Sequence, residues 1–234
     1  MPLPKIETPR YELTIPSTKK TVTFRPFLVK EEKILLIAQE SGNRNGMVKA
    51  MRDIVESCIL DKIDGNKLTV FDLEYIFLKL RAKSVGEVTT VKLLCSECSK
   101  ENLVDINIDN IELLEKPKLE NNIKLTDAVG VILQFPTVGD VMRMNFNGSE
   151  YDQMVEMIKL TIESIYDRDN IYPRAEANQE EITEFIDSLN HQQLETIGEF
   201  IKSCPQVTKT VEYDCQECGH PNKHVISGTE SFFG

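Results

Sequence analysis

Four of the six cysteines form two C-x-x-C pairs, Cys95 with Cys98 and Cys215 with Cys218. Each pair lies between two stretches of alternating apolar and polar residues, a pattern typical of the tip of a β-hairpin. Such a turn points two thiolates toward one spot, and a tetrahedral zinc ion needs two such pairs. The pairs are 120 positions apart (215 minus 95), so a shared site requires the chain to fold back. The motif predicts one zinc-ribbon-like site.

The same pairs allow other interpretations, which we rank behind a shared zinc ion. A redox C-x-x-C usually begins a helix, where the dipole lowers the thiol pKa, but polar hairpin residues follow both pairs. Two separate sites, or turns without metal, are the remaining alternatives. His220 and His224 lie near the second pair, and we interpret them as ordinary turn and strand residues because four sulfurs are already present. Zinc with four sulfur ligands would be structural, since no position is open for a substrate.

The composition is that of a globular protein, with 234 residues, 41% hydrophobic and 28% charged. The formal net charge of -11 repels phosphate backbones and anionic lipid, so we expect neither a nucleic-acid nor a membrane partner. The longest aliphatic run, residues 34–38, is far shorter than the roughly 20 residues that cross a bilayer. Common hydrolase, metalloprotease and nucleotide-binding motifs are absent, which favours a protein that is not an enzyme.

Apolar periodicity predicts an α+β fold of helical bundles with short antiparallel β-hairpins. In the first half we expect a hairpin at residues 11–24, helices at 30–39, 47–60 and 70–83, and the first cysteine hairpin at 87–108. In the second half we expect a hairpin at residues 123–135, helices at 138–145 and 150–166, and a long surface loop at 167–179. Two more helices at 181–189 and 191–202 should lead into the second cysteine hairpin at 207–226. Cys58 falls on the apolar stripe of the second helix and should lie in the core.

The order of hairpin, proline, helices and cysteine hairpin thus occurs twice. At an offset of 120 residues the two cysteine hairpins match without a gap at both cysteines, and also at Asn102 with Asn222 and Ile106 with Ile226. We hypothesise an internal duplication. Residues 1–116 would form the N-terminal half and residues 117–234 the C-terminal half, packed as one unit about a pseudo-twofold axis that brings the four thiolates together.

Runs at both ends of the chain resemble one family of phage proteins. The first extends from Pro4 to Ser41 and includes Phe24-Arg-Pro-Phe-Leu-Val-Lys-Glu-Glu-Lys33. The second comprises residues 184–189, Phe200, Pro205, the second cysteine pair and residues 228–233. Both resemble the baseplate hub protein family of T-even-type contractile-tailed bacteriophages, and the likeness is thin between residues 115 and 178.

This resemblance implies a non-enzymatic component or assembly factor of the baseplate hub, needed for tail assembly. Its partners would be other baseplate hub and tail proteins. It would work in the cytoplasm of the infected host, and either stay in the baseplate of the virion or leave after assembly like a chaperone. The family assigns no ligand residues, so the zinc ligands Cys95, Cys98, Cys215 and Cys218 rest on spacing alone. The alternative function is a cytosolic zinc or dithiol-redox regulatory protein.

Interfaces favour exposed aromatic anchors, and two segments at the ends of the chain offer them. Residues 25–29 and 231–233 each contain phenylalanine. Either these residues form an interface or they pack onto the chain's own helices.

Overall fold

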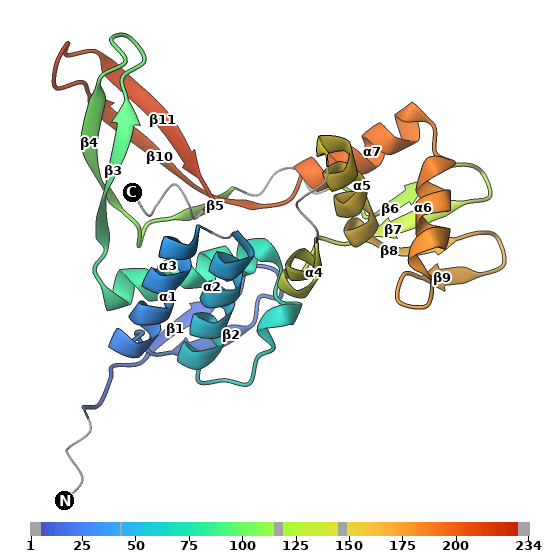
Figure 1. The fold of residues 1–234 in the computed structure, drawn as a ribbon, viewed down its shortest axis with the longest axis horizontal. Helices are drawn as coiled ribbons and strands as arrows, with labels where there is room; N and C mark the ends of the chain where they lie inside the picture. Colours follow the sequence, from blue (N-terminus) through green and yellow to red (C-terminus); the bar gives the residue numbers. More distant parts are fainter. Residues whose placement is uncertain (1–5, 43, 115–118, 145–148, 229–234) are drawn as a thin grey trace, which may run out of the picture. The chain divides into compact units, whose positions relative to one another are not determined.

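The computed structural model describes residues 6–42, 44–114, 119–144 and 149–228. In these ranges the chain forms seven α-helices and eleven strands, and every strand pair is antiparallel, so the fold is α+β (Figure 1). The chain divides into two compact units. Unit 1 comprises Met1–Leu114 and Gln206–Gly234, and unit 2 comprises Glu115–Pro205.

Unit 1 begins with a hairpin and three helices. These are β1 (Tyr11–Thr14), β2 (Thr21–Phe24), α1 (Val29–Ser41), α2 (Arg44–Cys58) and α3 (Val70–Ser84), with a 3-10 turn at Gly65–Lys67. The side chain of Thr69 accepts the N–H of Asp72 and so caps α3. Helix α3 is buried on several sides, because Ile76, Phe77 and Leu80 are all inaccessible to solvent. It is therefore the central element of this unit.

The two cysteine hairpins pack against α3. The first is β3 (Val88–Leu94) with β4 (Glu101–Asn107), and the second is β10 (Gln206–Asp214) with β11 (Pro221–Ser227). Figure 1 shows them side by side although residues 115–205 of unit 2 separate them in the sequence. Their inward side chains share one core with α3, formed by Leu78, Ala82, Val91, Ile106, Ile108, Ile111, Val207, Val211 and Ile226. A short strand, β5 (Glu112–Leu114), pairs with the start of β10.

Unit 2 is a four-stranded sheet with four helices. The strands follow the order β6 (Asn122–Lys124), β7 (Gly130–Leu133), β8 (Ile162–Tyr166) and β9 (Ile171–Pro173). The helices are α4 (Val138–Arg143), α5 (Glu150–Thr161), α6 (Gln179–Asp187) and α7 (His191–Lys202). Residues of β7, β8 and three of the helices form the core: Val131, Leu133, Val155, Ile158, Ile162, Ile182, Ile186, Ile197 and Phe200.

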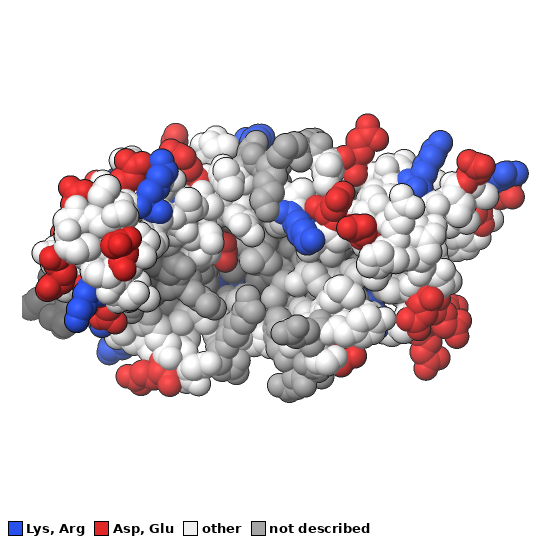
Figure 2. All heavy atoms as spheres, turned by 90° about the horizontal axis from the view of Figure 1, so that it is seen from above, with Lys and Arg blue, Asp and Glu red and all other residues white. Residues whose placement is uncertain are grey.

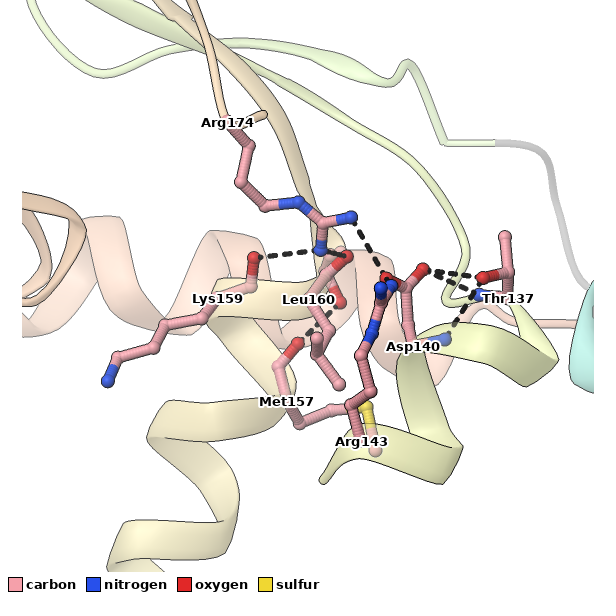
Figure 3. A network of polar contacts seen from close by, with 8 residues as sticks. Thr137, Asp140, Arg143, Met157, Lys159, Leu160 and Arg174 are labelled. Atoms are coloured by element: carbon pink, nitrogen blue, oxygen red, sulfur yellow. Dashed lines mark hydrogen bonds and ion pairs between the residues drawn. The ribbon is translucent and has the colours of Figure 1, made fainter. Parts of the chain in front are cut away.

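A buried carboxylate, Asp140, links three segments of unit 2 (Figure 3). Its side chain is only 4% exposed and closes a capping box with Thr137 at the start of α4. Arg174 donates to Asp140 Oδ1 at 3.0 Å and to the carbonyl of Leu160 at 2.8 Å, so it joins α4 to the end of α5. Burial would raise the pKa of Asp140, but the Thr137 hydrogen bonds and the Arg174 charge lower it below its ordinary value.

A second buried carboxylate, Glu31, ties α1 to the preceding hairpin. It accepts hydrogen bonds from Arg25 Nη2, from the N–H of Leu28 and from Ser57 Oγ, all at 2.9 Å. Burial would raise the pKa of Glu31, but these donors and the nearby Lys30 lower it to about 2. The charged form of this carboxylate is therefore much more stable in the folded chain than in water.

The structure corrects two expectations for the second half. The helix expected at residues 150–166 ends at Thr161, and residues 162–166 form β8, which pairs with β7. Ile158, Ile162 and Ile165 continue the helical spacing, so the local pattern does not reveal the change. The loop expected at residues 167–179 contains β9, which pairs with β8.

The compact units also differ from the division into residues 1–116 and 117–234. The second cysteine hairpin belongs to unit 1 because β10 pairs with β5 and shares the α3 core. Strands β8 and β9 have no counterpart among the described residues of the first half. The internal duplication, and the packing of the two halves as one unit, stay predictions.

The chain leaves unit 1 after Leu114 and returns to it at Gln206, and these two residues are partners in the β5–β10 ladder. We expect residues 115–205 to be replaceable by Asn-Gly, since this dipeptide forms the tight turn that joins two paired strands. The shortened chain should unfold cooperatively on heating, measured by circular dichroism. The same deletion joined by Pro-Pro is the control, because proline cannot form that turn. A shortened Asn-Gly chain without a cooperative transition would contradict the autonomy of unit 1.

Replacing Glu31 with glutamine should remove a pH-dependent part of the stability. The pKa is about 2 in the folded chain and ordinarily 4.5, so the contribution is fully present above pH 4.5 and lost as the pH falls toward 2. We expect Glu31→Gln to lower the free energy of unfolding at pH 7 by roughly 3 kcal/mol. The loss should shrink as the pH falls from 4.5 to 2, and urea titrations at pH 7, 4.5 and 3 measure it.

The neighbouring Glu32 provides the control, because it is exposed. Glu32→Gln should change the free energy of unfolding by less than about 0.5 kcal/mol at each pH. Equal stability of the two variants at pH 7 would show that Glu31 does not clamp α1.

Candidate metal centre

The two cysteine hairpins bring four sulfur atoms together. The Sγ atoms of Cys95, Cys98, Cys215 and Cys218 all lie within 4.8 Å of one another. Two close contacts join the hairpins: Cys95 Sγ lies 3.7 Å from Cys218 Sγ, and Cys98 Sγ lies 3.6 Å from Cys215 Sγ. The pairs are 120 positions apart in the sequence, and the structure brings them to one spot.

The spacing of the sulfur atoms suits a tetrahedral ion. Zinc–sulfur bonds of about 2.3 Å in a regular tetrahedron require sulfurs about 3.8 Å apart. Cys95 and Cys215 are buried, whereas Cys98 is half-buried and Cys218 is exposed. The first cysteine of each pair is thus fixed in the protein, and the second lies nearer solvent, where an ion could enter.

Each C-x-x-C is held in the same tight turn. The N–H of Cys95 donates to the carbonyl of Lys100 at 2.9 Å, and the N–H of Ser99 donates to the carbonyl of Cys95 at 3.0 Å. The second turn repeats both bonds, from Cys215 to His220 and from Gly219 to Cys215, each at 2.9 Å.

The last residue of each turn has a positive φ, 56° at Ser99 and 72° at Gly219. Glycine adopts this conformation without steric cost and serine does not. The first turn therefore keeps its shape despite a less suitable residue.

Hydrogen bonds favour negative charge on the first cysteine of each pair. The N–H groups of Cys98 and Glu97 and the amide of Asn222 lower the pKa of Cys95 to about 6. The N–H groups of Cys218 and Glu217 likewise lower the pKa of Cys215. A thiolate is the form that binds metal.

The second cysteine of each pair behaves in the opposite way. The N–H of Lys100 would lower the pKa of Cys98, and that of His220 would lower the pKa of Cys218. The neighbouring sulfurs, with partial loss of solvent at each thiol, outweigh these bonds, so the pKa of Cys98 rises and that of Cys218 reaches about 12. Four thiolates at this spacing repel one another, and a dication would let all four ionise.

Two buried asparagines, Asn102 and Asn222, lie between the hairpins beside the sulfurs. Each contacts the turn of the opposite hairpin through its side-chain amide. The sequence draws attention to these two asparagines only because they match each other at the offset of 120 residues. That match does not indicate a role. Periodicity marks them only as inward-facing strand residues.

The remaining candidates take ordinary positions. His224 stacks on Tyr213 with ring centroids 5.7 Å apart. Within the described residues, no group of three or more His, Cys, Asp or Glu side chains other than the four cysteines meets at one point suited to an ion. Cys58 is buried in the core as expected, and burial raises its pKa to about 11.

Two further properties concern the charge on the surface and the length and polarity of the helices. Figure 2 shows one face of the molecule, on which basic side chains stand singly among acidic ones. In the part of the chain that the structure describes, every helix is too short or too polar to span a bilayer.

Comparison with known proteins identifies the family. The model of the family described as T4 bacteriophage base plate protein matches residues 8–234. The baseplate hub assembly protein gp26 of Enterobacteria phage T4 is 22% identical over 223 residues, covering 95% of this chain and 97% of that protein. No solved structure matches. The match to the family model confirms the resemblance seen at the two ends of the sequence, and the chain belongs to the T4 bacteriophage base plate protein family.

Proposed function

We propose that this protein is a non-enzymatic component or assembly factor of the phage tail baseplate hub, needed for tail assembly. The single observation that carries the proposal is the family match over almost the whole chain. A relative of nearly equal length is a baseplate hub assembly protein, which supports the same role. Assembly would take place in the host cytoplasm, and the tail baseplate of the virion is the alternative final location.

The state of the buried carboxylates supports a role without catalysis. Glu31 and Asp140 have perturbed pKa values, which often mark active sites. In this chain both carboxylates are occupied by helix caps and arginine bonds, so they hold elements together. The four sulfurs would form a closed site, which leaves no position for a substrate.

An assembly protein needs a surface for its partner, and α1 offers one. Its outer side exposes a set of large apolar side chains that continues from the preceding residue: Leu28, Val29, Ile34, Leu36 and Ile37. Only Glu31 and Leu35 of this helix are buried. A set of exposed large apolar side chains on one helix marks an interaction surface. Phe27, which we considered as an aromatic anchor, is itself buried, and residues 231–233 lie outside the described residues.

The partner we propose for α1 is another baseplate or tail protein with an apolar surface. Lys30 and Lys33 are exposed beside the apolar side chains of α1, in a protein of net charge -11. Exposed Glu32 and Glu40 on the same helix balance these two lysines, so apolar contact would hold the partner.

Replacing Ile37 with glutamate should abolish this interaction without unfolding the chain. Ile37 is 68% exposed, so the free energy of unfolding should change by less than about 0.5 kcal/mol. Co-purification from infected cells, with tail proteins identified by mass spectrometry, should show at least a tenfold loss of the baseplate partner. Complementation of a phage lacking this gene should yield fewer assembled tails by electron microscopy.

Ile171→Glu is the matched control, because Ile171 lies in unit 2 and is 65% exposed. It should retain the partner and support tail assembly. Wild-type recovery of identified tail proteins by Ile37→Glu would overturn α1 as the docking surface. Failure of the wild-type protein to recover any tail protein would overturn the assembly role itself.

We also propose that Cys95, Cys98, Cys215 and Cys218 hold one structural zinc ion. The sulfur spacing and the soft, all-thiolate donor set fit zinc. The ion would join two hairpins of unit 1 that come from distant parts of the sequence. Against the dithiol-redox alternative stands the position of both pairs at hairpin tips, where no helix begins.

Purified protein should contain about one zinc ion per chain, measured by inductively coupled plasma mass spectrometry. A chelator should expose four additional thiols to alkylation and lower the melting temperature, because the ion links two hairpins. Cys58→Ser keeps all four proposed ligands and should keep its zinc, whereas Cys215→Ser should lose it. Less than half an equivalent of zinc, or four thiols that react equally with and without chelator, would contradict the site.

A further inference from the structure

We infer that Asn102 and Asn222 are positioning residues that each prepare one thiolate of the opposite hairpin for the ion. Asn222 serves Cys95 and Asn102 serves Cys215. This inference rests on the metal site proposed above. It adds that a productive site requires both hairpins, since neither hairpin supplies its own asparagine contact.

Asn222 bridges from β11 to the first cysteine turn. Its Oδ1 accepts the N–H of Ser96 at 2.9 Å and the hydroxyl of Ser96 at 3.0 Å. Its Nδ2 donates to the carbonyl of His220 at 2.8 Å and to Cys95 Sγ at 3.5 Å. One side chain thus holds its own turn, the opposite turn and a sulfur atom.

Asn102 repeats this arrangement in the other direction. Its Oδ1 accepts the N–H of Gln216 at 2.9 Å, and its Nδ2 donates to the carbonyl of Lys100 at 3.0 Å and to Cys215 Sγ at 3.7 Å. The two asparagines are 120 positions apart, and so are the two cysteines that they contact, which is the offset seen in the sequence. The same geometry at both hairpins argues that the contact is specific.

The side-chain amide of asparagine can both hold the opposite turn and donate a hydrogen bond to the sulfur. Asn102 is 1% and Asn222 is 5% exposed, so their own amide groups are buried and need these hydrogen-bond partners. An N–H donor stabilises a thiolate more than a thiol, and groups around the ligands orient them and tune the metal. Aspartate has nearly the same shape and keeps the acceptor, but it places a second negative charge beside the sulfur.

The decisive variants are Asn102→Ala, Asn222→Ala and the corresponding Asp substitutions. We expect each alanine variant to bind zinc about 10- to 100-fold more weakly in competition with a chelator, the range typical of groups behind a metal ligand. The two losses should be similar, because the contacts are symmetric. Each Asp variant should bind more weakly than its alanine counterpart. If an alanine variant does not fold, the Asp variant, which keeps the acceptor, decides.

Cobalt(II) substitution provides a readout that stability alone would not change. The thiolate-to-cobalt charge-transfer band should shift in both alanine variants, because a sulfur without its N–H donor gives charge to the metal more readily. Asn107→Ala is the matched control. Asn107 lies on the same strand as Asn102 and accepts the N–H of Asp109 at 2.8 Å. It should leave the zinc affinity and the cobalt spectrum unchanged.

The outcomes separate this inference from the metal site. Wild-type zinc affinity and cobalt spectrum in the asparagine variants, or a loss no larger than that of Asn107→Ala, would overturn the positioning role and leave the zinc site standing. A wild-type chain that binds neither zinc nor cobalt would overturn the site and this role together.

Discussion

The meeting of two cysteine hairpins from distant parts of the sequence is the constraint on which unit 1 depends. Between them the chain leaves at β5, forms unit 2 and returns at β10 beside its point of departure. Closing so long a loop costs conformational entropy, which a link across its ends offsets. The shared α3 core, the asparagine bridges and a four-sulfur ion would all act at this closure.

Buried charges serve the same end on a smaller scale. Glu31 fixes α1 to the hairpin before it, and Asp140 fixes α4 to the end of α5 through Arg174. Each carboxylate is completely paired, which is the condition under which a buried charge stabilises a fold. A rigid frame of this kind can hold α1 with its apolar side exposed. That exposed side is a feature of unit 1 that internal packing does not account for.

Local signals in the sequence predicted most of the elements. Apolar periodicity predicted a helix at residues 70–83, and α3 spans Val70–Ser84; strict alternation around each C-x-x-C predicted the paired strands. The convergence of the four sulfurs also followed from the motif, because tetrahedral coordination demands two such pairs. The predictions that failed concern elements that depend on contacts between residues distant in the sequence. Ile162 continues a helical stripe but pairs as a strand with β7, and the return of β10 to β5 leaves no local mark.

Metal K-edge X-ray absorption of the purified, full-length protein tests the central claim most directly, because it reads the atoms bound to the ion. One zinc ion shared by both hairpins predicts a single shell of four sulfur atoms at about 2.3 Å. A shell with two sulfurs completed by nitrogen or oxygen atoms would show that each hairpin acts alone, and would contradict a zinc ion shared between them.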